Sequence, residues 1–240
     1  MWLINSPIGR KVVMSLTGIC LILFLTFHAC MNVVALFSGK AYNMICELLG
    51  ANWYAVVATM GLAFLALCHI FFAFWLTAQN RKARGSERYA VTERRPEVSW
   101  ASQNMLVLGI IILLGLLLHL FNFWYNMMFA ELVGMEGLAH GPADGFAWIK
   151  ETFSQPVYVV LYVIWIVAIW FHLSHGFWSA MQTLGVNGKI WFNRWKMIGL
   201  IYVTILMALF LIVVLAFAFG LAPSLCCDGG SCCEAAAACC

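Results

Sequence analysis

Five long apolar runs dominate the chain, and charged or turn-forming residues separate each run from the next. The runs cover approximately residues 12–37, 53–79, 102–128, 155–184 and 197–221. A helix needs about 20 apolar residues to cross a hydrocarbon layer about 30 Å thick, and each run is long enough. None alternates polar and apolar positions as a barrel strand would, and a helix satisfies its own backbone hydrogen bonds in lipid. The pattern predicts an all-α membrane protein with a bundle of five transmembrane helices.

Composition supports a protein in contact with lipid. Of the 240 residues, 64% are hydrophobic and 10% are charged, whereas about 25% of the residues in soluble domains are charged. One membrane-embedded domain is expected over residues 1–225. The formal net charge of +3 is too small to indicate a nucleic-acid partner.

The positive charges predict the orientation of the bundle. They gather before the first helix, between the second and third, and between the fourth and fifth, at Arg10, Lys11, Arg81, Lys82, Arg84, Arg88, Arg94, Arg95, Lys189, Arg194 and Lys196. The opposite connections contain only Lys40 and Lys150. Basic connections stay on the cytoplasmic side. We therefore expect a cytoplasmic N-terminus and a C-terminus outside.

Four of the predicted helices carry a histidine deep in apolar sequence, at His28, His69, His119 and His172. Ionisable side chains at membrane depth are costly and indicate function. Counting residues at about 1.5 Å each along the helices estimates the depth of every histidine. This predicts an outer pair, His28 with His119, and an inner pair, His69 with His172.

Two pairs at two depths are typical of two b-type haems. Such a haem takes two axial imidazoles, usually from different helices, and needs an apolar slot for its ring. Small residues stand near the histidines, at Ala29, Ala66, Gly115 and Gly176. We interpret the four histidines as axial ligands of two haem b groups that form an electron path across the bilayer.

Other interpretations stay open. The histidines of a transporter or proton channel could relay protons or bind a metal, which predicts intramembrane acids and inverted repeats. The predicted helices contain almost no Asp or Glu. A haem-free anchor would leave the four histidines unexplained. His175, one turn after His172, could contact a haem propionate, bond a neighbour or replace His172 as ligand, and His140 is expected to be solvated.

Two segments resemble a known family. They are SPIGRKVVMSLTG at residues 6–18, which precedes His28, and HLSHGFWSAMQTLG at residues 172–185. With His69 and His119 in order between them, the chain resembles the diheme cytochrome b membrane anchor of succinate dehydrogenases and fumarate reductases, in its single-chain, five-helix form. The resemblance covers roughly residues 5–220.

The resemblance implies partners and cofactors. It assigns His69 and His172 to the inner haem, and His28 and His119 to the outer haem. It implies a flavoprotein with FAD and an iron–sulfur subunit on the cytoplasmic face of a bacterial inner membrane, with dimerisation of the complex left open. The basic segment 81–95 could dock these subunits or simply reflect topology. The isolated chain would contribute only the quinone half-reaction, in either direction, in succinate oxidation or in anaerobic fumarate reduction.

The expected substrate is a quinone near the outer haem, with menaquinone as the expected type. Glu47 lies in the connection after the first helix, where some relatives carry an acidic or histidine side chain beside the quinone. Its carboxylate could exchange protons with the quinone or be a solvated charge. Some fumarate-reducing relatives have a proton-carrying glutamate two residues before the fourth-helix ligand, and Trp170 stands there in this chain. Whether turnover is electroneutral is therefore open.

The C-terminal segment 226–240 is rich in cysteine and lies outside the family pattern. Its six thiols could form disulfides in an oxidising compartment or bind metal. Their spacing is not that of an iron–sulfur site. We expect a disordered tail.

Overall fold

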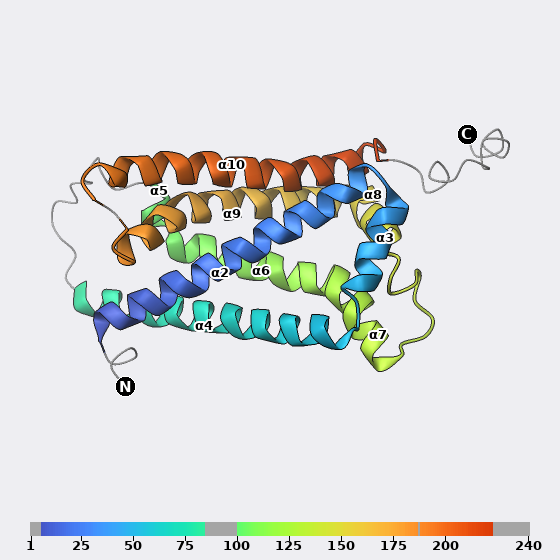
Figure 1. The fold of residues 1–240 in the computed structure, drawn as a ribbon, viewed down its shortest axis with the longest axis horizontal. Helices are drawn as coiled ribbons and strands as arrows, with labels where there is room; N and C mark the ends of the chain where they lie inside the picture. The colour runs from blue at the N-terminus through green and yellow to red at the C-terminus, as the bar shows by residue number, and fades with distance from the viewer. Residues whose placement is uncertain (1–5, 85–99, 187, 223–240) are drawn as a thin grey trace. The chain divides into compact units, whose positions relative to one another are not determined.

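A computed structural model of the chain describes residues 6–84, 100–186 and 188–222 (Figure 1). The described residues form helices and no strand. Five helical segments are long and apolar enough to cross a membrane: α2 (Pro7–Val33) with η1 (Val34–Leu36), α4 (Trp53–Arg84), α6 (Met105–His119) with η2 (Leu120–Phe129) and α7 (Ala130–Val133), α9 (Pro156–Thr183), and α10 (Trp191–Ala218). The predicted five-helix, all-α membrane protein is confirmed.

Large apolar side chains on every span are exposed, as a lipid-facing surface requires. Leu23, Phe64, Leu114, Ile164 and Ile205, one from each span, are all more than half exposed. A soluble protein would bury most side chains of this kind. The chain is therefore a multi-pass membrane protein.

Two helices begin earlier than the apolar pattern predicts. α2 begins at Pro7, where proline suits the first helical position, and the Ser6 hydroxyl caps it by accepting from the Gly9 amide at 2.9 Å. α10 begins at Trp191, although its apolar run starts at residue 197. Arg and Lys are good helix formers that extend their charges to water, so a charged residue ends the apolar pattern without ending the helix.

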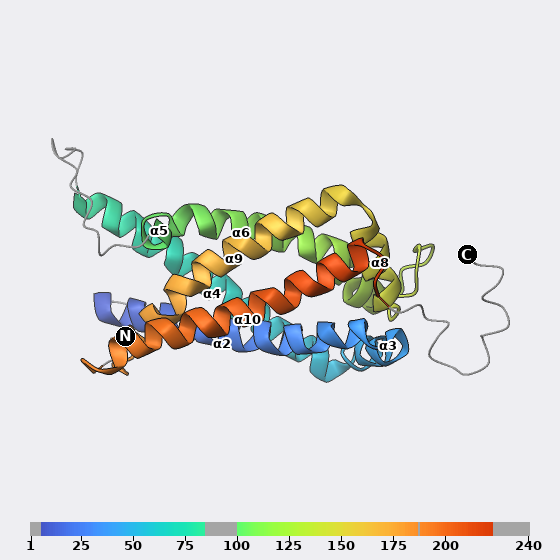
Figure 2. The ribbon, with the colours of Figure 1, turned by 90° about the horizontal axis from the view of Figure 1, so that it is seen from above.

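Short helices in the connections were not predicted. They are α3 (Gly39–Leu48) and α8 (Gly145–Ser154), whereas α5 (Trp100–Gln103) overlaps the start of the predicted run 102–128. Ser38 caps α3 by accepting from the Ala41 amide at 3.1 Å, and Asp144 caps α8 by accepting from the Ala147 amide at 3.2 Å. α3 and α8 lie side by side (Figures 1 and 2). These connections are therefore ordered helical structure.

The chain divides into two compact units. Unit 1 comprises residues 1–25, 59–113 and 167–207, and unit 2 comprises residues 26–58, 114–166 and 208–240. In unit 1, Ala101, Leu108 and Ala168 form a buried cluster with Phe171. In unit 2, rings from different helices pack edge to face in the pairs Phe146–Phe217 and Phe153–Tyr162, at 5.2 and 5.1 Å between centroids.

Charge is sorted between the units. Among the described residues, every Asp and Glu belongs to unit 2, and only Lys40 and Lys150 of the Lys and Arg residues do. The uneven distribution of Lys and Arg, from which the orientation is predicted, is therefore also a difference between the two units. Part of the basic segment, with Arg88, Arg94 and Arg95, and the cysteine-rich tail at 226–240 lie outside the described residues.

Candidate functional site

Four histidines of the spanning helices lie in two close pairs. His28 on α2 and His119 on α6 have ring centroids 5.7 Å apart and ring planes at 85°. His69 on α4 and His172 on α9 have centroids 6.4 Å apart and planes at 68°. These are the two pairs that residue counting predicts. The first lies in unit 2 and the second in unit 1.

The spacing within each pair suits two ligands of one metal ion. An imidazole nitrogen binds a transition metal at about 2 Å, and the ring centroid lies roughly 1 Å beyond that nitrogen, so two opposed rings have centroids about 6 Å apart. The observed 5.7 and 6.4 Å bracket this value. Because a haem iron takes two axial ligands, the donor set of each pair fits one haem.

Aromatic rings surround the outer pair. Besides His28, His119 has three ring neighbours within 6.2 Å between centroids, namely Phe123, Tyr162 and Trp165, and the Phe210 centroid lies 5.8 Å from that of His28. The Nδ1 atom of His119 is buried and has no hydrogen-bond partner among the described residues. A buried polar atom without a partner is unfavourable. His119 is thus held by packing, with an unsatisfied ring nitrogen.

A π-helix follows His119 directly, over Leu120–Phe129. π-helices are rare and often occur at functional sites. The side-chain amide of Asn126 donates to the carbonyls of Phe121 and Asn122 at 3.2 and 3.0 Å. The backbone therefore changes from α-helix to π-helix directly after His119, a candidate ligand. The apolar pattern does not predict this change.

The two members of the inner pair differ in their hydrogen bonding. The Nδ1 atom of His69 lies 3.2 Å from the Thr17 hydroxyl on α2. The Nδ1 atom of His172 is buried and has no partner among the described residues. The residue counts that predict the pair give no sign of the Thr17 contact.

His175 does not form a ring pair with His69, because His172 is the ring that faces it. The His175 ring packs edge to face on Trp178 at 5.0 Å, and its Nδ1 is buried without a hydrogen-bond partner in the described part of the chain. The Lys196 amine lies over the same Trp178 ring at 4.8 Å, so a positive charge lies near His175. A positive charge near His175 favours an anionic group there over a metal ion.

Two residues from the sequence analysis have hydrogen-bonded or ionic partners. The indole of Trp170 donates to the Thr204 hydroxyl of α10 at 2.9 Å, so this position holds a neutral donor between helices. His140, expected to be solvated, lies 3.0 Å from the Glu151 carboxylate and packs on Trp148. The expectation of a purely solvated His140 is wrong, because the connection folds back on α8.

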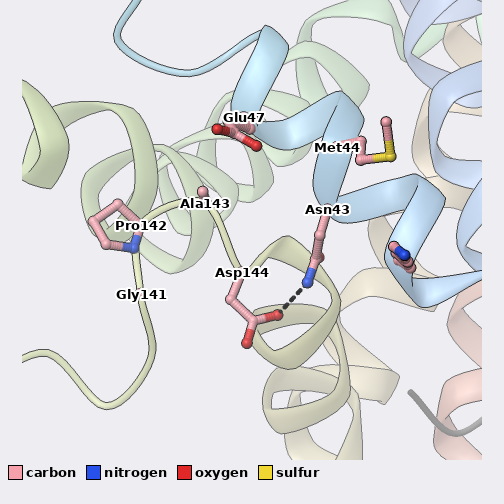
Figure 3. Close-up of a pocket in the computed structure, with 8 residues that line it drawn as sticks. Asn43, Met44, Glu47, Gly141, Pro142, Ala143 and Asp144 are labelled. Carbon is pink, nitrogen blue, oxygen red and sulfur yellow. Dashed lines mark hydrogen bonds between the residues drawn. The ribbon is translucent and has the colours of Figure 1, made fainter. Parts of the chain in front are cut away.

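Glu47 lies on α3 at a surface pocket of about 510 Å³. The pocket is lined by residues of α3 and of the loop before α8, namely Lys40, Asn43, Met44, Glu47, Gly141, Pro142, Ala143 and Asp144 (Figure 3). Glu47 itself is exposed. Its carboxylate is therefore accessible to water at this pocket.

Two hydrogen bonds of the Asn43 side chain, which the sequence does not predict, join α3 to the start of α8 at this pocket; we call them the clasp. The Asn43 amide donates to Asp144 at 2.8 Å (Figure 3), and the Phe146 amide donates back to the Asn43 carbonyl oxygen at 2.9 Å. Asn43 and Asp144 are 101 residues apart in the chain. Asp144 before Gly145 is a readable helix cap, but nothing in the sequence identifies Asn43 as its partner.

A series of hydrogen bonds also connects α3 to α2. Burial raises the pKa of Cys46 to about 11, and that of Tyr42 well above its ordinary range. The Tyr42 hydroxyl donates to Asn32 at 3.2 Å, and the Asn32 amide donates to the His28 carbonyl at 2.8 Å. α3 is therefore tied to the turn of α2 that carries a candidate ligand.

Known protein families, characterised proteins and solved structures contain no match to this chain. Within residues 6–84, 100–186 and 188–222, no three or more His, Cys, Asp or Glu side chains form a group that could hold a metal ion. Each histidine pair would give a metal two protein ligands. The porphyrin of a six-coordinate haem leaves two iron positions for such ligands.

Proposed function

We propose that the chain is a membrane cytochrome b subunit that carries electrons between a quinone and a cytoplasmic iron–sulfur subunit, as part of a succinate dehydrogenase or fumarate reductase. One observation carries the proposal. Histidines from α2, α4, α6 and α9 form two facing pairs with centroid separations of 5.7 and 6.4 Å, which suit two axial ligands on one iron. Two such pairs would hold two haem b groups.

Each residue pair has a defined part in this proposal. His28 and His119 would hold the outer haem, and His69 and His172 the inner one. Bound haem supplies a one-electron carrier whose potential depends on its ligands and on its burial. The rings around His119 would exclude water from the outer centre, and the Lys196 charge beside His175 would favour an anionic haem propionate at the inner one.

The quinone reaction requires protons as well as electrons. A quinol releases two electrons and two protons when it becomes a quinone, and the reverse reaction takes up both. Glu47 is an exposed carboxylate at a pocket of about 510 Å³, so it can exchange these protons with the outside. We propose menaquinone as the quinone, and the outer side of a bacterial cytoplasmic membrane as its place of reaction.

The charge of unit 1 supports a partner on the cytoplasmic side. Its described residues include Arg81, Lys82, Arg84 and Lys189 and contain no Asp or Glu. The iron–sulfur subunit would dock on this basic surface, and the flavoprotein with FAD would bind the iron–sulfur subunit. Succinate and fumarate would react in the flavoprotein, so this chain completes only the quinone half of either reaction.

The first test is a count of haem in the purified chain. A dithionite-reduced minus oxidised spectrum, with haem measured as pyridine haemochrome, should give two b haems per chain. H69A and H172A should each lose the same haem, and H28A and H119A the other. The control is H140A, which removes a histidine outside the spanning helices and should keep both haems.

Two outcomes would contradict the proposal. A folded chain that contains no haem, although expressed with adequate haem supply, would favour proton or metal transport by the same histidines. Loss of one and the same haem from H28A and H69A would show that the facing pairs are not the ligand pairs. With two haems present, quinol oxidation should require the soluble subunits and should decrease in E47Q.

A further inference from the structure

Thr17 and His69 meet in unit 1, where helices α2 and α4 each contribute one side chain. The Thr17 hydroxyl oxygen is 3.2 Å from Nδ1 of His69, and Thr17 is only 6% exposed. A hydrogen bond between side chains in apolar surroundings is stronger than one in water. The contact can therefore control the orientation of the imidazole.

The direction of this hydrogen bond follows from the other partners of Thr17. Its hydroxyl lies 2.9 Å from the Val13 carbonyl and 3.1 Å from the Met14 carbonyl. Carbonyls only accept, and a hydroxyl has one hydrogen, so we place that hydrogen on the backbone of α2. With this placement the Thr17 oxygen accepts from Nδ1–H of His69, and the Met14 carbonyl is a backbone partner of the same imidazole. This gives the neutral imidazole its proton on Nδ1 and leaves the lone pair on Nε2.

Gly18 makes this approach close. A Cβ atom built at Gly18 would lie 3.2 Å from Cε1 of His69 and 3.7 Å from its Nδ1. The imidazole therefore rests against the backbone of α2, where a larger residue would displace it. The pair Thr17–Gly18 thus supplies both an acceptor and the space for the ring.

We propose that Thr17 is a positioning residue that holds His69 in the Nδ1–H tautomer with Nε2 free to bind a metal. For the identity of that metal group, the inference rests on the proposed haem function. A hydrogen bond from Nδ1–H increases the basicity of the ligating nitrogen, which stabilises ferric relative to ferrous iron. Thr17 should therefore lower the potential of the inner haem. The Nδ1 atoms of His119 and His172 have no such acceptor among the described residues.

The test compares T17V, T17S and T183V in the full chain. Valine keeps the shape of Thr17 and removes its oxygen, whereas serine keeps the hydroxyl. T183V is the matched control, because among the described residues the Thr183 hydroxyl bonds only the Ser179 carbonyl of its own helix, at 3.0 Å. Redox titration should give a higher potential for the inner haem in T17V and an unchanged outer haem. The affinity of the inner site for haem should fall by about tenfold, the lower end of the effect when a hydrogen-bond partner of a metal ligand is removed.

A second readout does not depend on the haem potential. Nitrogen and proton NMR of labelled histidine, in the dithionite-reduced protein, should show the Nδ1–H of His69 hydrogen-bonded in the natural chain and in T17S. T17V should shift this Nδ1–H resonance toward that of a proton with a weaker acceptor, and T183V should leave it unchanged. A wild-type potential together with a wild-type His69 spectrum in T17V would overturn the inference, because the backbone of α2 would then hold the ring without Thr17. If the chain contains no haem, the proposed function fails, and the NMR comparison still decides the role of Thr17.

Discussion

Replacing Gly115 by alanine should disturb the outer histidine pair selectively. Gly115 is on α6, one turn before His119. A Cβ atom at this position would overlap the indole of Trp165, which itself packs on the His119 ring at 5.5 Å. From the sequence, Gly115 is one of the small residues expected to leave room for a haem. In the structure the indole of Trp165 lies against this glycine.

The size of the effect follows from two opposing terms. Overpacking a close contact costs about 1–3 kcal/mol, and removing glycine from a helix interior returns about 0.5–1 kcal/mol. The expected net destabilisation is therefore about 0–2.5 kcal/mol. Gly109 provides the control on the same helix, because no described atom lies within 4 Å of a Cβ built there. G109A should show only the favourable helix term.

Thermal unfolding in detergent, with the haem spectrum recorded on the same samples, would measure this difference. G115A should unfold at a lower temperature than G109A, by about 2–4 °C per kcal/mol, and should lose the same haem as H119A does. G109A should retain both haems. Equal stability and equal haem content in the two variants would refute the packing argument, because Trp165 would then have an alternative position of equal energy.

Two further predictions concern the outer connections. N43A removes both hydrogen bonds of the clasp, at 2.8 and 2.9 Å, and should destabilise the packing of α3 on α8 by about 2–4 kcal/mol. Limited proteolysis should therefore cleave N43A near α8. The control N104A should not be cleaved there, because the bond that it loses lies within one exposed helical turn. Burial raises the pKa of Cys46 from its ordinary 9.0 to about 11, so its neutral thiol stabilises the folded chain below pH 9, and this contribution is lost as pH rises toward 11. The unfolding temperature of the natural chain should therefore fall more steeply than that of C46A over this interval, and parallel curves would contradict the burial of this thiol.

The sequence by itself determined the five spanning helices and the pairing of their histidines. A continuous apolar run in lipid has few alternatives to a helix, whatever its neighbours are. Depth then follows from the helical rise, so His28 and His119, and likewise His69 and His172, could be matched by counting. The sorting of charge could be read in the same way, because it depends only on which connection carries each residue.

Only the tertiary structure decided which side chains meet around these pairs. The Thr17–His69 contact and the packing of Trp165 on Gly115 depend on the rotation of each helix about its axis, and a uniformly apolar run leaves this rotation undetermined. The Asn43–Asp144 clasp joins residues 101 positions apart, and its polar partners look like ordinary loop residues in the sequence. Helix length and depth are local properties of the chain, whereas the hydrogen bonds that orient each imidazole arise when the helices pack.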